Sequence, residues 1–136
     1  MSDVLTSAQR RRCMASVGAK DTKPELTVRR LVHSLGFRYR LHVPDLPGRP
    51  DLVFSGRHKV VFVHGCFWHR HNCARGRSVP SIRANFWMDK LEANRRRDAK
   101  NRRRLIRLGW KVLTVWECQT KRPEWLLPRL VDFLEG

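Results

Sequence analysis

The chain has 136 residues, of which 41% are hydrophobic, and this suits one folded domain with a packed core. Its 29 lysines and arginines outnumber 12 acidic residues, so the formal net charge is +17 and we expect nucleic acid as the partner rather than an anionic membrane surface. No apolar run approaches the ~20 residues of a membrane-spanning helix, and the opening residues lack a secretory signal, which favours a cytoplasmic protein with reduced thiols.

Residues 1–21 are polar and basic, and Arg10, Arg11 and Arg12 stand together. Such a segment either is a disordered tail without a role or lies along DNA and becomes ordered on binding. We predict a flexible basic N-terminal arm over residues 1–21, followed by a single domain over residues 22–136.

The first predicted helix covers residues 22–35. Thr22 followed three residues later by Glu25 is the pattern of a capping box, in which each side chain binds the backbone of the other residue. Apolar residues then recur at helical spacing, and Gly36 indicates the end of the helix.

Three strands are predicted next, over residues 37–43, 51–54 and 59–63, with turns between them. The first alternates apolar and polar residues as a half-buried strand does, whereas the third is nearly all apolar, which predicts burial on both faces. Short turns between consecutive strands favour an antiparallel meander.

The second half of the chain opens with an irregular stretch rich in cysteine and histidine, over residues 64–80. A long basic helix over residues 81–108, a strand over 110–116 and a helix over 123–134 are predicted to follow. Because the long helix provides a crossover to the fourth strand, we predict an α/β fold with a mixed four-stranded sheet flanked by helices.

Two strand ends carry polar residues that are predicted to meet. Asp51 begins one strand and His64 ends the next, and antiparallel neighbours bring such ends together. A carboxylate there could hold Mg²⁺, which prefers oxygen ligands and polarises a phosphodiester. On spacing alone, an ordinary turn aspartate after Pro50 is the commoner explanation.

Three cysteines and one histidine have the composition of a closed, structural zinc site: Cys66, His71, Cys73 and Cys118. The alternative is a set of reduced, buried thiols. Cys13 lies in the arm and is interpreted as a plain thiol. A spare histidine in this stretch, His69, is either a general base for water or a support for the zinc ligands.

Two aromatic pairs, at residues 67–68 and 86–87, lie in cationic surroundings. They act either as wedges that unstack a base step or simply as core residues. In the long helix only Asp98 interrupts the arginine-rich run over residues 95–104, and so one-sided a run favours phosphate contacts over a merely solvated face.

Four stretches together resemble the very short patch repair endonucleases, and the likeness covers nearly the whole chain. They are PDLPGRPD at 44–51, VHGCFWHRHNC at 63–73, FWMDKLEANRRRD at 86–98 and LGWKVLTVWEC at 108–118. The resemblance implies a restriction-endonuclease-like core of variant PD-(D/E)xK type with a structural zinc site. It also implies a bacterial, nucleoid-associated monomer that nicks double-stranded DNA 5′ to the thymine of a T:G mismatch left by deamination of 5-methylcytosine. The implied cofactor is Mg²⁺, and general mismatch-repair proteins are implied partners.

The resemblance also implies catalytic roles. Asp51 would be the central magnesium ligand and the main-chain carbonyl of Val63 a second, at a position where the family often has threonine. His64 stands where related nucleases place a lysine, and His69 resembles the residue that activates water. Glu25 resembles a residue that holds metal-bound water, a role that competes with its capping-box interpretation.

The remaining implied roles concern zinc and DNA. The cysteine–histidine set given above matches the family's zinc ligands, which leaves His69 free for catalysis. The residues implied in DNA binding are the wedge Phe67, Trp68 and Trp87, the base-reading Lys90 and Asn94, the neighbouring Arg95 and Arg96, and Met14 of the arm. The sequence departs from the family at residues 74–79, which affects the expected flanking-sequence preference rather than the chemistry.

Overall fold

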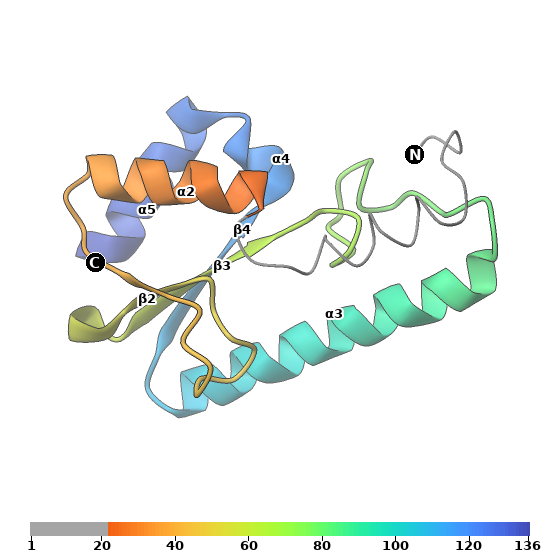
Figure 1. Ribbon diagram of the computed structural model, residues 1–136, viewed down its shortest axis with the longest axis horizontal. Coiled ribbons are helices and arrows are strands. Elements are labelled where there is room, and N and C mark those ends of the chain that lie inside the picture. Colours follow the sequence, from red (N-terminus) through yellow and green to blue (C-terminus); the bar gives the residue numbers. More distant parts are fainter. Residues whose placement is uncertain (1–21) are drawn as a thin grey trace.

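The computed structural model describes residues 22–136, so the predicted arm and its residue Met14 lie outside the described residues. Four strands form one sheet in the order of the chain: β1 (Arg40–Leu41), β2 (Leu52–Phe54), β3 (Lys59–His64) and β4 (Lys111–Trp116). The first two junctions are antiparallel and the third is parallel (Figure 1). The predicted mixed four-stranded sheet is therefore confirmed.

The first strand is much shorter than the predicted range 37–43. His42 has a positive φ of 50°, a left-handed conformation that ends the extended segment. Phe37 and Tyr39 pack against the core, but Leu41 is 41% exposed and Val43 packs against a different apolar cluster, so the alternating pattern holds only over the first half of the predicted strand.

Helices cover both faces of the sheet (Figure 1). The first, α2 (Lys23–Ser34), and the last, α5 (Pro123–Glu135), lie on one face, while α3 (Ala84–Arg107) runs along the other. The short helix α4 (Glu117–Thr120), directly after β4, was not predicted. Helix α3 begins at Ala84 rather than at residue 81, because Arg83 adopts a left-handed conformation with φ of 52°.

The capping box of α2 forms only in half. The Glu25 backbone N–H donates to Oγ1 of Thr22 at 3.4 Å, as expected of an N-cap. The Glu25 carboxylate does not complete the box: it turns toward Arg29 and His42 instead. Cap and carboxylate are thus separate features, and the competition predicted between them does not arise.

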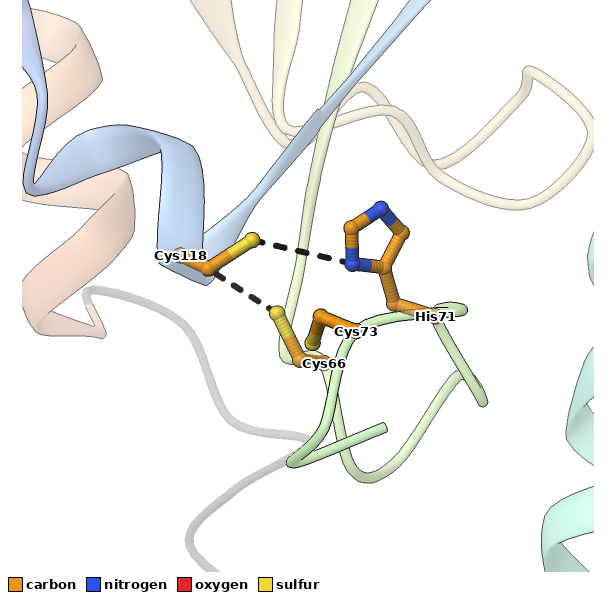
Figure 2. Close-up of side chains that lie close together, drawn as sticks. All are labelled: Cys66, His71, Cys73 and Cys118. Carbon is orange, nitrogen blue, oxygen red and sulfur yellow. Dashed lines mark hydrogen bonds between the residues drawn. The ribbon is translucent and has the colours of Figure 1, made fainter. Parts of the chain in front are cut away.

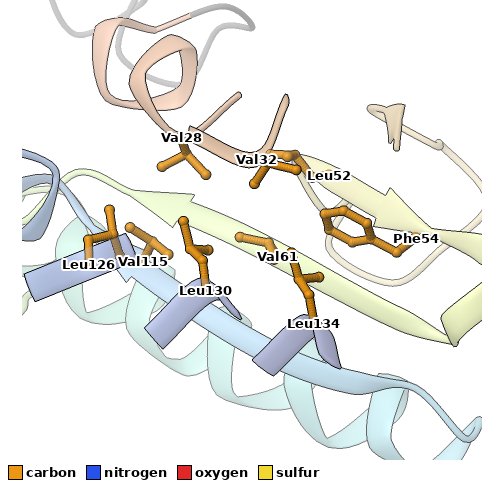
Figure 3. Packing of buried hydrophobic residues seen from close by; sticks show 9 residues of the cluster. All are labelled: Val28, Val32, Leu52, Phe54, Val61, Val115, Leu126, Leu130 and Leu134. Atoms are coloured by element: carbon orange, nitrogen blue, oxygen red, sulfur yellow. The ribbon is translucent and has the colours of Figure 1, made fainter. Parts of the chain in front are cut away.

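Two apolar clusters hold the sheet between its helices. The larger lies between the sheet and helices α2 and α5 (Figure 3), and its buried members are Val28, Val32, Leu52, Phe54, Val61, Val115, Leu126, Leu130 and Leu134. The smaller lies on the opposite face and contains Val53, Val60, Phe62 and Leu105 of α3. Strand β3 is therefore buried on both faces, as predicted.

None of the helices in the described part of the chain is long and apolar enough to cross a membrane.

Candidate active site and metal centre

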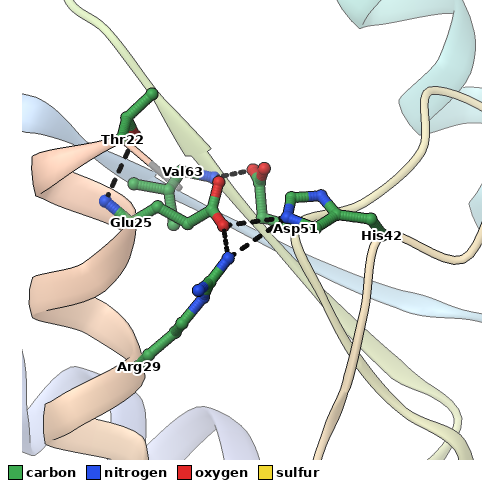
Figure 4. Close-up of polar contacts among 6 residues, drawn as sticks. All are labelled: Thr22, Glu25, Arg29, His42, Asp51 and Val63. Atoms are coloured by element: carbon green, nitrogen blue, oxygen red, sulfur yellow. Dashed lines mark hydrogen bonds and ion pairs between the residues drawn. The ribbon is translucent and has the colours of Figure 1, made fainter. Parts of the chain in front are cut away.

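The start of β2 and the end of β3 meet as the strand pattern predicted. Leu52 pairs with Val61, which places Asp51 near the following residues of β3. The Val63 backbone N–H donates to Oδ2 of Asp51 at 2.6 Å (Figure 4). The hydrogen bond orients the carboxylate while leaving its other oxygen available to a ligand.

The half-buried Asp51 shares its surroundings with the buried carboxylate of Glu25. Burial raises the pKa of Asp51 to about 7; the hydrogen bond from Val63 lowers it and the neighbouring Glu25 raises it. Glu25 is only 2% exposed. A buried and a half-buried carboxylate this close repel each other unless a proton or a cation lies between them, so this donor set fits a hard divalent cation.

His42 completes this acidic cluster, and sequence reasoning missed it. Its Nε2 lies 3.0 Å from Oε2 of Glu25, and one ligand atom from each of His42, Glu25 and Asp51 lies within 4.8 Å of the others (Figure 4). A single histidine in a strand-like segment carries no signal of this kind. Only the left-handed turn at His42 brings its ring back toward α2.

Two histidines and an aspartate form a second cluster beside the first. The rings of His64 and His69 are stacked, with centroids 3.8 Å apart and an angle of 10° between planes. His69 Nδ1 lies 2.5 Å from Oδ2 of Asp98, across from the middle of α3. Burial lowers the pKa of His64 to about 3, with His69 lowering it further and Asp98 opposing the shift, so His64 is neutral at ordinary pH.

Asp98 is a second residue that sequence reasoning missed. The signal was present, because it alone interrupts the arginine run, but it was interpreted only as a break in the charge pattern. Its carboxylate faces the imidazole of His69, and such a carboxylate orients the ring.

One cavity of about 550 Å³ connects both clusters. All four predicted catalytic residues line it, together with the residues missed from sequence and several from the cysteine-rich loop. The lining residues that matter below are Glu25, His42, Arg49, Asp51, His64, Gly65, Phe67, Trp68, His69, Arg75, Asp98 and Glu117. The cavity thus combines oxygen donors for a cation with an imidazole for proton transfer.

The predicted zinc ligands also meet (Figure 2). One ligand atom from each of Cys66, His71, Cys73 and Cys118 lies within 4.8 Å of the others, although Cys118 comes from α4. Backbone N–H groups point at two of the sulfurs: that of Cys118 donates to Cys66 Sγ at 3.3 Å and that of Gly76 to Cys73 Sγ at 3.4 Å. N–H donors of this kind stabilise thiolates, so the set fits a structural zinc ion.

Acidity within this cluster is uneven. Burial raises the pKa of Cys66 to about 12. Burial acts the same way on Cys73, but hydrogen bonds from the Gly76 N–H and from His71 outweigh it and lower the pKa of Cys73 to about 6. One thiolate is therefore available near neutral pH, and a bound metal would have to displace the proton from Cys66.

Trp116, at the end of β4, joins the cysteine cluster to the cavity. Its ring stacks on His71 at 4.4 Å and meets the edge of His64 at 5.4 Å. His69 lies between the two in sequence but contacts Asp98 and His64 instead of the sulfurs. Ordering the cysteine cluster therefore orders the loop that carries His69.

The predicted wedge residues differ in exposure. Phe67 is 4% exposed and packs edge-to-face on Trp68 at 5.0 Å. Trp68 and Trp87 are half-buried, whereas Phe86 is 43% exposed. Phe67 is thus a core residue here, as one of the two interpretations allowed, and it supports the more accessible Trp68.

The predicted base-reading and phosphate-binding residues lie along α3. Asn94 Nδ2 donates to the Trp68 carbonyl at 3.3 Å, which ties α3 to the aromatic loop. Lys90 lies over the Trp87 ring at 5.7 Å. Arg95 and Arg96 are exposed beside Glu92. Their contacts with DNA stay predictions.

Comparison with known proteins identifies the family of the chain. A family model described as DNA mismatch endonuclease Vsr matches residues 2–75, more than half of the chain. The Type II nicking enzyme V.XorIIP of Xanthomonas oryzae pv. oryzae is 47% identical over 135 residues, covering 99% of this chain and 98% of the relative. V.NmeAIP of Neisseria meningitidis is 42% identical over 121 residues, with 89% and 86% covered.

The DNA mismatch endonuclease Vsr of Escherichia coli K12 is 40% identical over 124 residues, covering 91% of this chain and 79% of the relative. Matches of this length span the carboxylate cluster, the histidine cluster and the cysteine cluster together. The chain therefore belongs to the DNA mismatch endonuclease Vsr family and is a DNA endonuclease.

Proposed function

We propose that this endonuclease nicks one strand of duplex DNA 5′ to the thymine of a T:G mismatch, by magnesium-dependent hydrolysis. The observation that carries the proposal is the single cavity in which the Asp51–Glu25 carboxylate pair faces the His64–His69–Asp98 cluster. The relatives named above as a mismatch endonuclease and as nicking enzymes support the mismatch and the single-strand cut.

Asp51 and Glu25 would hold Mg²⁺, with the Val63 carbonyl as a further oxygen ligand. When bound, the ion supplies positive charge that polarises the phosphodiester and stabilises the leaving oxygen. The protein's part is to keep the carboxylates in place: Val63 donates to Asp51, and Arg29 and His42 contact Glu25. Removal of Asp51 would leave Glu25 in place with its partners, but the cation would lose its oxygen ligand at the start of β2.

His69 is the proposed general base. Donation of its Nδ1–H to Asp98 leaves a lone pair on Nε2, which takes a proton from the attacking water. Asp98 stabilises the imidazolium that results. His64, neutral and stacked on His69, provides an N–H to position water or a phosphate oxygen rather than a positive charge.

Zinc is proposed at the cysteine cluster as a structural ion. Four protein ligands leave no open position for substrate, so its role is to hold the loop that carries His69 and Trp68. The turn at Pro50 and Asp51, followed by the β2–β3 pair, agrees with a variant PD-(D/E)xK core. By the family resemblance, Phe62 and His64 would stand where related nucleases place an acid and a lysine.

Mismatch recognition is proposed for α3 and for the loop after β3 that carries Phe67 and Trp68. Trp68 and Trp87, with Phe67 behind, would open the stack, while Lys90 and Asn94 read the bases. A wobble pair costs less to distort than a matched pair, so deformability adds to direct contacts.

The basic arm, including Met14, and the arginines of α3, including Arg95 and Arg96, would bind phosphates and provide most of the affinity. We propose that the enzyme works as a monomer, so that one cavity cuts one strand in each encounter. Its proposed place is the bacterial nucleoid, in the cytoplasm, beside general mismatch-repair proteins.

A nicking assay on labelled duplexes tests the proposal. Duplexes carrying T:G, T:A and C:G at one position are incubated with and without Mg²⁺. We expect a single nick 5′ to the mismatched thymine, only with Mg²⁺. An Asp51→Ala variant should lose nicking and keep DNA binding. Equal nicking of all three duplexes would show a nuclease of the same family with another target.

A further inference from the structure

The cavity poses an electrostatic problem for its substrate. Four carboxylates line it, from Glu25, Asp51, Asp98 and Glu117, and a DNA phosphate is itself an anion. A divalent cation offsets the charge near Asp51. Glu117 lies beside Gly65, directly after His64, and a phosphate there would meet an unfavourable negative charge unless a cation of the protein lies nearby.

Arg75 supplies a positive charge beside Glu117. Its Nη1 lies 3.8 Å from Oε2 of Glu117, and the two side chains are 64% and 25% exposed. Oε1 of Glu117 lies 3.9 Å from where a β-carbon on Gly65 would stand. The guanidinium is therefore positioned next to the turn that follows His64. A distance of 3.8 Å is too long for a hydrogen bond, and an exposed pair of this kind is readily exchanged.

The backbone at Arg75 is firmly held although its side chain is exposed. The Ser78 N–H and Oγ both donate to the Arg75 carbonyl, at 3.3 and 2.7 Å. Gly76 packs tightly against the backbone of His71 in the same loop: a β-carbon on Gly76 would stand 1.9 Å from the His71 carbonyl oxygen. The loop thus closes against the zinc-ligand segment and presents Arg75, rather than its neighbours, to the cavity.

We propose that Arg75 binds a phosphate of the DNA strand that enters the cavity, and that Glu117 holds its guanidinium ready until the phosphate replaces the carboxylate. A guanidinium can bind a phosphate through two parallel N–H···O bonds, which a weak pair with Glu117 does not prevent. The inference rests on the proposed function, because it takes the cavity as the place where the cut strand lies.

Arg77 offers a matched control. It is exposed, belongs to the same loop and carries the same charge, but it does not line the cavity. Loss of either arginine lowers the net charge equally. A general electrostatic effect would therefore weaken DNA binding and nicking by the same factor in Arg75→Ala and Arg77→Ala. Only a phosphate contact made by Arg75 distinguishes them.

The test measures single-turnover nicking of a T:G duplex at enzyme concentrations below Kd, where the rate reports binding as well as chemistry, together with DNA affinity at several salt concentrations. We expect Arg75→Ala to slow nicking by about tenfold to hundredfold, the effect of losing a charged hydrogen bond. Arg77→Ala should change it by less than about threefold. Arg75→Lys should recover part of the rate, since a point charge keeps the attraction but not the paired geometry.

The zinc content and thermal stability of each variant show whether the substitution has disturbed the folding of the loop. If Arg75→Ala disturbs either, the pair Arg75→Gln and Arg77→Gln, which keeps more of the side chain, replaces it. Equal nicking by the two members of a pair overturns the proposal. Asp51→Ala, assayed in parallel, separates this failure from that of the proposed function: if it still nicks, the cavity is not the active site at all.

Discussion

The carboxylate–imidazole cavity and the cysteine cluster are both suited to metals, but they are built in opposite ways. The cavity has oxygen and nitrogen donors around about 550 Å³ of accessible space. The cysteine cluster has four ligand groups that face one another and a buried Cys66. Open coordination suits an ion that meets substrate, whereas closed coordination suits an ion that only cross-links the chain. Trp116 contacts a histidine from each, so the closed site can stabilise the open one.

The comparison is tested most severely by removing a zinc ligand. Cys118→Ser should lower zinc content well below one per chain and abolish nicking, because binding of structural zinc contributes on the order of 10 kcal/mol of folding free energy. Metal analysis and thermal unfolding check this outcome. Cys13→Ser, in the arm, is the control for loss of a thiol. Full activity of a zinc-free Cys118→Ser protein would show that zinc is not needed to hold the active site in place.

A smaller effect is expected from Asp98→Asn. The amide can still accept a hydrogen bond but carries no charge to stabilise protonated His69, so single-turnover nicking should fall by about a hundredfold. The pH–rate profile should change as well, since the charge partner of His69 is gone. Glu92→Gln removes an exposed carboxylate from the same helix and should leave the rate nearly unchanged. Equal rates for the two variants would exclude a role of Asp98.

The magnesium requirement should depend on pH. Because the pKa of Asp51 is raised to about 7 by burial, a proton competes with the cation below neutral pH. The Mg²⁺ concentration for half-maximal nicking should therefore rise about tenfold from pH 8 to pH 6. Magnesium titrations of the nicking rate at each pH measure it. A requirement that does not change with pH would argue against Asp51 as the ligand.

Stability without magnesium should depend on pH as well. A carboxyl whose folded pKa lies above its unfolded value stabilises the fold below the unfolded pKa, 3.8 here, and loses that contribution as pH rises through about 7. Asp51→Asn stays neutral. Relative to that of the native protein, its free energy of unfolding should therefore increase by roughly 2–4 kcal/mol from pH 4 to pH 8, at about 1.4 kcal/mol per pKa unit.

Denaturant unfolding of the zinc-loaded proteins at both pH values measures this gain. Asp45→Asn, at an exposed aspartate of the same loop, is the control for the substitution itself. A gain that is the same at both pH values would mean that burial of the Asp51 charge is not its cause.

Strand and helix patterns predicted most of the architecture, because strands β2 and β3 and helix α3 carry strong periodicity or apolar runs. The meeting of Asp51 with His64 followed from antiparallel pairing, and the set of cysteines followed from ligand chemistry. What sequence could not predict depends on single backbone angles and on distant contacts. His42 joins Glu25 only through a left-handed turn, and Asp98 reaches His69 only because α3 packs under the sheet.

The measurement that tests the central claim most directly is a magnesium titration of nicking by the zinc-loaded protein, beside Asp51→Ala with the same zinc content. We expect no nicking with zinc alone, saturable nicking with added Mg²⁺ and none by the variant. Nicking at full rate without Mg²⁺, or by Asp51→Ala, would contradict it.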